Sequence, residues 1–193
     1  MSPRNAAHNE LAREQATKAI QDAALSLFAQ LGYKNTSISA IARKAGVSKG
    51  LIYHYFASKE IILYTLFDSL KSLGDNLMDQ AIAIQDPHES LRYILDAQFD
   101  FIQNNSELMR LIIGLSLQPD AMTQLSSSID AATNQQVMKF NSILTELGYA
   151  NPDVEAYSLT AMMDGICLGY LAMGDKYPLK EMKRRMYATY LSE

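Results

Sequence analysis

The sequence is poor in the residues that build covalently linked or metal-stabilised scaffolds. Cys167 is the single cysteine among 193 residues, so it has no partner for a disulfide within the chain and cannot complete a cysteine-based zinc site. Nine glycines and five prolines are too few for a loop-rich or low-complexity protein. We therefore expect a globular protein that carries neither a metal ion nor a cofactor.

Long apolar runs are also missing. A membrane-spanning helix needs about 18 consecutive apolar residues, and the best stretch, residues 161–174, is interrupted by Asp164. The chain begins Met-Ser-Pro-Arg-Asn, without the apolar segment of a secretory signal. From these two absences we expect a soluble, cytoplasmic protein that does not engage a membrane.

Hydrophobic residues make up 48% of the chain and charged residues 20%, which allows a buried core and excludes an intrinsically disordered chain. The net charge of −4 is unevenly distributed, because residues 1–60 carry +4 and residues 61–193 carry −8. A basic head on an acidic body suits a protein that binds a polyanion. Short windows also drift by this much in unrelated proteins, so the charge alone leaves nucleic-acid binding open.

Helical periodicity dominates the chain, and no segment alternates convincingly between apolar and polar residues. There is no internal repeat, and the expected fold class is all-α. Capping residues and apolar spacing predict about nine helices, at residues 15–31, 38–46, 49–56, 59–84, 87–104, 106–117, 120–147, 152–174 and 178–191.

The second and third of these helices, with the turn 45–48 between them, have the proportions of a helix-turn-helix. Gly46 permits the positive φ that a tight turn needs, and Ser48 can satisfy free N–H groups at the start of the third helix. The partial positive charge of that helix start, followed by Lys49, suits a phosphate or a base edge. Gly50 lets the backbone approach its target closely, as expected of a helix that enters the major groove by its N-terminal end. The next turn adds hydroxyl and imidazole donors from Tyr53, His54 and Tyr55.

A longer pattern surrounds this motif and closely resembles the DNA-binding domain of the TetR family. The resemblance covers about residues 13–63, and it consists of many separate elements that keep the family's order and spacing. It implies a three-helix head, residues 1–58, that binds operator DNA, and a helical body, residues 59–193, that binds an inducer and forms a homodimer. The matching elements are Ala23–Phe28, Gly32-Tyr33, Thr36–Ile38, Ile41-Ala42, Ala45–Gly50, Ile52–Phe56 and Ser58–Glu60.

The resemblance also implies contacts from the recognition helix. Lys49 and Gly50 are expected to approach bases. Leu51 occupies a position that is often polar in the family, and its apolar side chain could touch a thymine methyl. Contacts to phosphates or base edges are implied for Ser48, Tyr53, His54 and Tyr55.

Two further phosphate contacts are implied outside that helix. Thr36 and Ser37 are expected to hold a phosphate at the start of the second helix, and Lys59 another at the start of the fourth. The simpler alternatives are a solvated surface charge for Lys59 and pure packing for Tyr53.

No catalytic constellation is visible in the body. The three histidines, His8, His54 and His88, have no carboxylate at metal-ligand spacing, and no glycine loop for phosphates is present. Cys167 lies in an apolar helical segment and is expected to be inert core. We therefore do not expect an enzyme.

The body has more apolar surface than a thin bundle needs, and its methionines suit a wall that adapts to varied ligands. The alternative for each such residue is ordinary core or dimer interface. Asp96, Asp100 and Asp164 interrupt the apolar surroundings and could meet a cationic ligand, although exposure or pairing explains them more simply. The residues expected to line an effector pocket are Phe99, Met109, Ile113, Met163, Ile166 and Tyr170.

The last two predicted helices carry a candidate dimer interface. Gly165 and Gly169 lie four residues apart, so a partner helix can approach closely, and Ala161 extends the same strip. Met182 and Met186 of the terminal helix are expected to supply the other half of a two-fold four-helix interface.

Together these features predict a homodimeric transcriptional regulator, a repressor released from its operator by a small, largely apolar effector. Two recognition helices about 34–36 Å apart would read a pseudo-palindrome in double-stranded DNA. Effector binding would shift the helix at 59–84, which joins head and body. The alternative is a ligand carrier or all-α enzyme whose head has lost DNA binding, and salt-dependent DNA affinity separates the two.

Overall fold

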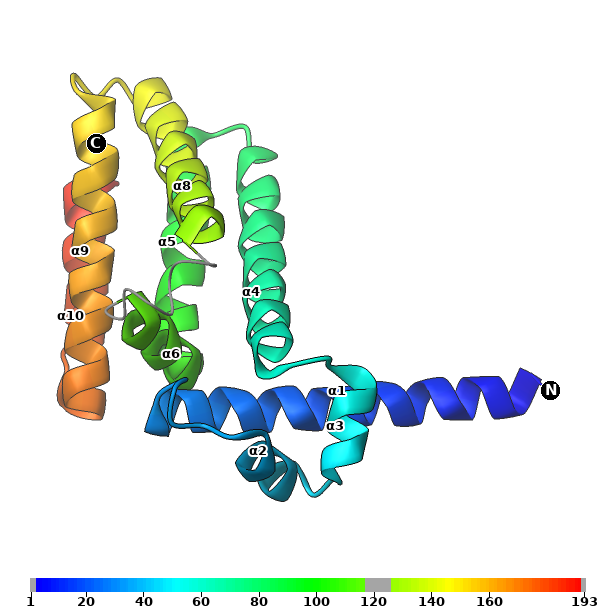
Figure 1. The fold of residues 1–193 in the computed structure, drawn as a ribbon. Coiled ribbons are helices and arrows are strands. Elements are labelled where there is room, and N and C mark those ends of the chain that lie inside the picture. Colours follow the sequence, from blue (N-terminus) through cyan, green and yellow to red (C-terminus); the bar gives the residue numbers. More distant parts are fainter. Residues whose placement is uncertain (1–2, 117–125, 192–193) are drawn as a thin grey trace. The chain divides into compact units, whose positions relative to one another are not determined.

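The computed structural model describes residues 3–116 and 126–191, and all regular structure within these ranges is helical (Figure 1). The expected all-α class is confirmed. None of the described helices is long and apolar enough to cross a membrane. The elements are α1 (Pro3–Leu31), α2 (Ile38–Ala45), α3 (Lys49–Tyr55), α4 (Lys59–Ile82), α5 (Pro87–Asn104), α6 (Ser106–Ser116), α8 (Ser126–Glu146), α9 (Pro152–Met173), the 3-10 turn η1 (Gly174–Lys176) and α10 (Leu179–Tyr190).

Helix α1 is much longer than the segment 15–31 that its apolar spacing predicts. It begins at Pro3, a residue well suited to the first helical position. The side chains at positions 10–15 are all exposed, so this part of the helix has no apolar face that a periodicity analysis could detect. The predicted helix 120–147 corresponds to α8, and its first six residues lie outside the described ranges.

The described residues form two compact units. The first contains residues up to Leu70 together with residues 110–116, and the second contains residues 71–109 and those from 126 onward. Helix α4 contributes to both units, because its residues up to Leu70 belong to the first and its remaining residues to the second.

The first unit is built around one apolar cluster. Ile20, Ala24 and Phe28 recur every four residues along α1 and are at most 2% exposed. Helix α2 packs against this part of α1 and against α3, while the first half of α1 extends beyond them (Figure 1). The cluster is completed by fully or almost fully buried residues from the other helices, Ile41, Ile52, Phe56, Ile62 and Leu63.

The second unit is a helical bundle in which α8 packs along α9, α5 packs against α8, and α10 packs against both α5 and α9. Its core side chains lie at helical spacing, so each helix turns one apolar stripe inward. Burying one such side chain contributes about 1.5–3 kcal/mol. The fully buried members include Leu91, Ile94, Leu95, Phe140, Leu144, Leu159 and Met186.

Candidate nucleic-acid interface

The helix-turn-helix is fixed by two serine caps and one glycine turn. The hydroxyl oxygen of Ser37 accepts a hydrogen bond from the N–H of Ala40 at 3.2 Å, and that of Ser48 accepts one from Leu51 at 3.1 Å. Between the helices, Gly46 has a φ of 68°, which side-chain-bearing residues rarely adopt. Each serine keeps its own hydroxyl proton for another acceptor, so both helix starts combine a free donor with a favourable dipole.

Helix α3 has a buried side and an exposed side. Ile52 is 0% exposed and Phe56, directly after the helix, is 4% exposed. Tyr55 is half-buried, and its ring lies edge-on to that of His54 with 5.0 Å between centroids. Tyr53 is 56% exposed. The remaining predicted contacts of this helix are also exposed, namely Ser48, Lys49, Gly50 and His54.

The segment that carries these residues has positive charge without compensation. Residues 35–58 contain no aspartate or glutamate, and their three cations, Arg43, Lys44 and Lys49, are all exposed. An acid-free basic surface is the electrostatic signature of phosphate binding. Arg43 and Lys44 were not among the predicted contacts, although the absence of acids over this segment is a signal that the sequence already contains.

The expectation that the Thr36 side chain holds a phosphate is wrong. Thr36 is only 2% exposed. Its hydroxyl donates to the carbonyl oxygens of Gly32 at 2.9 Å and Leu27 at 3.2 Å, and its N–H donates to the carbonyl of Tyr33. No donor of Thr36 is left for DNA, because the residue ties the end of α1 to the start of α2.

Lys59 is likewise engaged within the chain. Its Nζ donates to the carbonyl oxygens of Tyr33 at 2.8 Å and Thr36 at 2.9 Å, and it lies 4.3 Å from the centroid of the Tyr33 ring. Burial lowers the pKa of Lys59, although the negative charge of Glu60 opposes this shift. The ammonium therefore binds carbonyl groups of its own chain, whereas the resemblance implies that it binds a DNA phosphate.

The six residues expected to line an effector pocket are placed unequally. Phe99, Met163 and Ile166 are 2–6% exposed and belong to the packed core of the second unit. Met109 and Tyr170 are half-buried in that unit. Ile113 belongs to the first unit, so the six do not gather in a single described unit.

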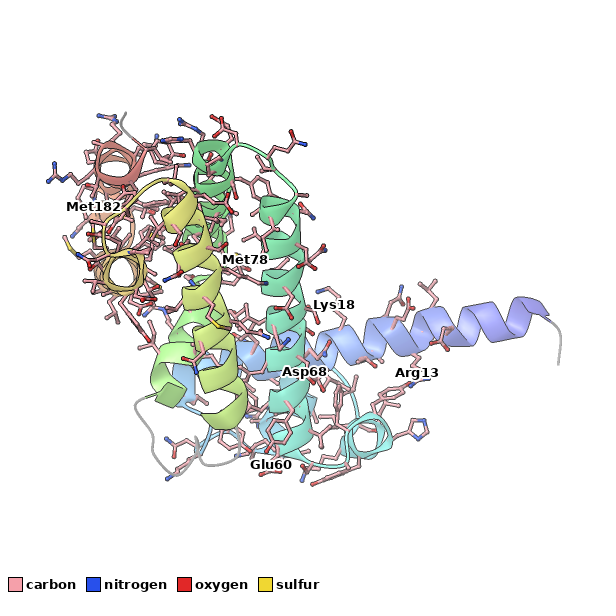
Figure 2. All side chains as sticks on the ribbon, turned by 90° about the horizontal axis from the view of Figure 1, so that it is seen from above. Arg13, Lys18, Glu60, Asp68, Met78 and Met182 are labelled. Carbon is pink, nitrogen blue, oxygen red and sulfur yellow. The ribbon has the colours of Figure 1, made fainter. Side chains whose placement is uncertain are left out.

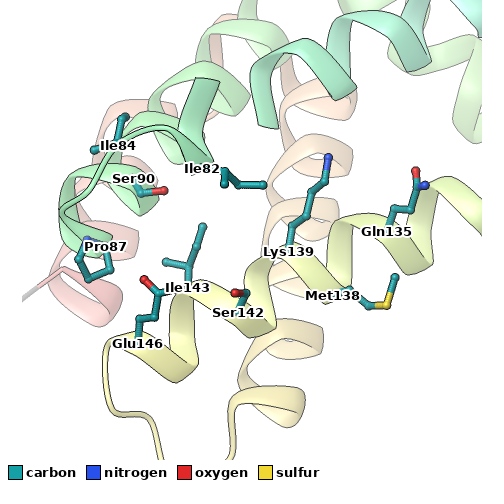
Figure 3. Close-up of a pocket in the computed structure, with 10 residues that line it drawn as sticks. All are labelled: Ile82, Ile84, Pro87, Ser90, Gln135, Met138, Lys139, Ser142, Ile143 and Glu146. Atoms are coloured by element: carbon teal, nitrogen blue, oxygen red, sulfur yellow. The ribbon is translucent and has the colours of Figure 1, made fainter. Parts of the chain in front are cut away.

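A hollow of about 450 Å³ in the second unit has a different lining. It lies where the end of α4 and the start of α5 face α8, and Lys139 extends from α8 toward α4 (Figure 3). The α8 residues of its wall follow helical spacing but mix polar and apolar side chains, so no apolar stripe marks them in the sequence. The lining comprises Ile82, Ile84, Pro87, Ser90, Gln135, Met138, Lys139, Ser142, Ile143 and Glu146.

The terminal helix contradicts one expected dimer contact. Met186 is 0% exposed within its own chain, so it is core of the second unit and is not available to a partner. Met182 is half-buried. The outward side of α10 is instead polar, with Arg184 and Arg185 exposed, because the apolar stripe of this helix turns toward α5 and α9.

The glycines of α9 differ from each other in their surroundings. A Cβ on Gly169 would lie 2.7 Å from Cζ of Tyr177 and closer still to its Cε2, so the space beside Gly169 is filled by this chain's own ring. No heavy atom lies within 4 Å of a Cβ placed on Gly165. Gly165 and Ala161 are both exposed and remain open to a partner helix.

Asp96 is paired within the chain, so pairing explains it more simply than the binding of a cationic ligand. It accepts hydrogen bonds from Nζ of Lys183 and from the hydroxyl of Tyr187. Burial alone raises the pKa of Asp96, but these two hydrogen bonds and the charges of Lys183 and Arg92 outweigh it, so the pKa lies below its usual value. Within the described ranges, histidine, cysteine and carboxylate side chains do not gather into a group of three or more that could hold a metal ion.

Comparison with known proteins places these features in a family. A family model described as "Bacterial regulatory proteins, tetR family" matches residues 20–64. The HTH-type transcriptional regulator BetI of Stenotrophomonas maltophilia is 27% identical over 164 residues, which cover 82% of each chain. The HTH-type transcriptional activator FasR of Mycolicibacterium smegmatis is 30% identical over 129 residues, 65% of this chain and 59% of FasR.

Solved structures agree on the fold. The transcriptional regulator FadR of Bacillus subtilis, solved in complex with stearoyl-CoA, matches with a TM-score of 0.74 and 22% identity over 91% of this chain and 97% of that one. An all-α chain that carries a helix-turn-helix and is related over most of its length to HTH-type transcriptional regulators is itself a helix-turn-helix transcriptional regulator. The match to residues 20–64 and the related regulators make the class more specific: residues 20–64 form a DNA-binding domain of the TetR family, and the chain is a transcriptional regulator related to BetI.

Proposed function

We propose that this regulator is a repressor that binds a pseudo-palindromic operator as a homodimer and is released by a small, largely apolar effector. Residues 1–58 act as the DNA-binding domain, and residues 59–193 bind the effector and form the dimer. The protein works in the cytoplasm, by binding and not by catalysis. The observation that carries the proposal is the outer side of α3, where Lys49 and Tyr53 are exposed in a segment that has no acid.

Seven of the nine predicted DNA contacts remain in this proposal. Lys49 and Gly50 meet base edges, since both are exposed in the first turn of α3, the end by which such helices enter the major groove. Ser37 holds a phosphate at the start of α2. The others reach phosphates or base edges from the start and second turn of α3, namely Ser48, Tyr53, His54 and Tyr55.

The homodimer is supported by an apolar stripe on the outer side of α9. Val154, Tyr157 and Leu168 are 63%, 60% and 50% exposed, and their spacing places them on one face of the helix. Ala161 and Gly165 lie between them on the same face. Large exposed apolar stripes mark protein interfaces, and a second copy of the chain would cover this one and give the dimer two recognition helices.

An apolar effector is supported by the related fold that holds stearoyl-CoA, a ligand with a long hydrocarbon chain. Deletion of the gene, followed by RNA measurement, tests the sign of regulation. Transcripts next to the operator should rise if the protein represses, whereas a fall would assign it the role that FasR has by name.

DNA binding is tested by titrating the purified protein with its own upstream intergenic DNA and with a scrambled control at two salt concentrations. We expect selective binding that weakens as salt rises, because phosphate contacts release counterions. Lys49→Ala should cost about 1–3 kcal/mol per half-site and reduce discrimination between the two DNAs. Lys180→Ala, at an exposed lysine of α10, is the matched control and should bind as the parent does.

Equal affinity for both DNAs, unchanged by Lys49→Ala, would contradict the proposal. The next step would then be selection from genomic fragments. If no fragment were enriched, the ligand carrier with an idle head would be the better account of this chain.

A further inference from the structure

Two parts of the head meet at the ammonium group of Lys59, and a third, α1, packs against one of them. This residue begins α4, and its two carbonyl partners, Tyr33 and Thr36, lie in the connection between α1 and α2. The Tyr33 hydroxyl donates to Oε1 of Glu60 at 2.9 Å, which adds a second bond between the same connection and the first turn of α4. The Tyr33 ring also packs edge-on against Phe28 of α1, with 5.2 Å between centroids.

The junction is half-buried at Tyr33 and Lys59, and Glu60 is exposed. Burial raises the pKa of Tyr33, and the hydrogen bond to Glu60 adds to this shift. Two of the three N–H donors of Lys59 are committed to carbonyls, and its ammonium also faces the Tyr33 ring. Directly beyond it along α4, Ile62 and Leu63 are 0% and 3% exposed, so the first turn of α4 is packed as well as hydrogen-bonded.

The hydrogen bonds of Lys59 connect α4 to the helix-turn-helix. Thr36 directly precedes Ser37, the cap of α2, and α2 packs against α3. The orientation of α2 and α3 is therefore tied to the first residue of α4 through one side chain. Helix α4 then continues without a break to Ile82.

We propose that Lys59 is a positioning residue: it locks the orientation of α2 and α3 against α4 and thereby sets which spacing between DNA half-sites the dimer accepts. This inference rests on the proposed function, a homodimer that reads two half-sites. If the joint is locked, the free protein already has the geometry that it adopts on DNA. This raises its affinity for operators with the one spacing that fits and lowers its affinity for the others.

The test measures how affinity depends on the distance between half-sites. An operator selected with the wild-type protein is compared with versions in which the half-sites are one base pair closer or farther apart. For the wild-type protein we expect a loss of about 5- to 100-fold for either change, comparable to a mismatched base pair. Lys59→Met should weaken binding to the best spacing and reduce that loss to about threefold or less, because a loosened head adapts to each spacing.

Lys18→Met is the matched control. Lys18 lies on α1, with its side chain 76% exposed (Figure 2), and its replacement removes the same charge without touching the junction. We expect this variant to keep the wild-type spacing preference. A general loss of stability would lower affinity for all spacings by one factor, so the ratio between spacings separates positioning from a merely structural role.

Two further readouts keep the test decisive. If Lys59 contacted phosphate, the slope of log affinity against log salt would fall by about 0.9 per lysine, or about 1.8 for a dimer, with the spacing preference unchanged, and the inference would be overturned. Tyr33→Phe removes only the bond to Glu60 and should give a smaller change in the same direction, even if Lys59→Met folds poorly. An unaltered spacing ratio in Tyr33→Phe and in any folded Lys59→Met would also overturn it. Absence of selective binding by the wild-type protein would refute the proposed function itself.

Discussion

Replacing Gly169 by alanine tests the most specific packing contact of the second unit. The ring of Tyr177, which follows η1, lies directly against the bare backbone of Gly169 on α9. An added methyl group would overlap three ring atoms, the farthest at 3.0 Å. The ring has to move away from α9.

Two opposing effects determine how much Gly169→Ala changes the stability of the protein. Alanine in place of glycine inside a helix favours folding by about 1 kcal/mol, whereas forcing extra atoms into a packed site costs about 1–3 kcal/mol. Gly165→Ala provides the reference, because it gains the same helix propensity and meets no heavy atom within 4 Å. We expect the Gly169 variant to be less stable than the Gly165 variant by about 1–3 kcal/mol.

Urea unfolding at several protein concentrations is the appropriate assay, since a dimer's midpoint depends on concentration. Adding Tyr177→Ala should remove the clash and turn Gly169→Ala into a mildly stabilising change, which a double-mutant cycle detects as coupling. Equal stabilisation by both glycine substitutions would refute the packing of Tyr177 on α9. A weaker dimer in Gly165→Ala, without a less stable subunit, would locate the partner helix at Gly165.

Other substitutions test the reassigned residues. Thr36→Val should destabilise the protein by about 1–3 kcal/mol, because buried carbonyls lose their donor, and it should leave the salt dependence of DNA binding unchanged. Met186→Ala should cost about 2–5 kcal/mol by opening a cavity, and Met182→Ala, at a half-buried site, clearly less. The lowered pKa of Asp96 means that its pairing with Lys183 stabilises the fold above the usual carboxyl pKa of about 3.9 and loses this effect as pH falls through the lower folded value. Acid unfolding below pH 4 should therefore be less steep in Asp96→Asn than in the wild-type protein.

The helix-turn-helix could be predicted almost residue by residue because its determinants are local. Ser37, Gly46 and Ser48 act on N–H groups and backbone angles only a few positions away, so their meaning survives without knowledge of the rest of the fold. The length of α1 could not be predicted in the same way. The side chains at positions 10–15 are all exposed, so this part of the helix has no buried apolar face, and helix propensity alone is a weak signal in a single sequence.

Which surface covers an apolar stripe is harder to predict from the sequence. Met182, Met186 and Tyr190 recur every four residues, and this spacing correctly predicts that one side of α10 is buried. It does not say whether the covering surface belongs to the same chain or to a partner. In the structure Met186 and Tyr190 are covered from within, whereas on α9 it is the stripe around Tyr157 that stays open. The hollow beside α8 escaped prediction for a related reason, since its walls come from residues 82–90 and 135–146.

Thr36 and Lys59 show where a family pattern stops being informative about contacts. The pattern specifies residue types and positions, and both residues match it as hydrogen-bond donors at helix starts. A donor binds phosphate only if no nearer acceptor has taken its proton, and that depends on the path of the chain between them. Here the connection 32–37 folds back so that its own carbonyls reach the Thr36 hydroxyl and, 23 residues further along the chain, the Lys59 ammonium. The same two donors that suggested a surface for phosphate thus bind carbonyl groups of this chain, and we expect DNA affinity to depend on them through geometry and not through charge.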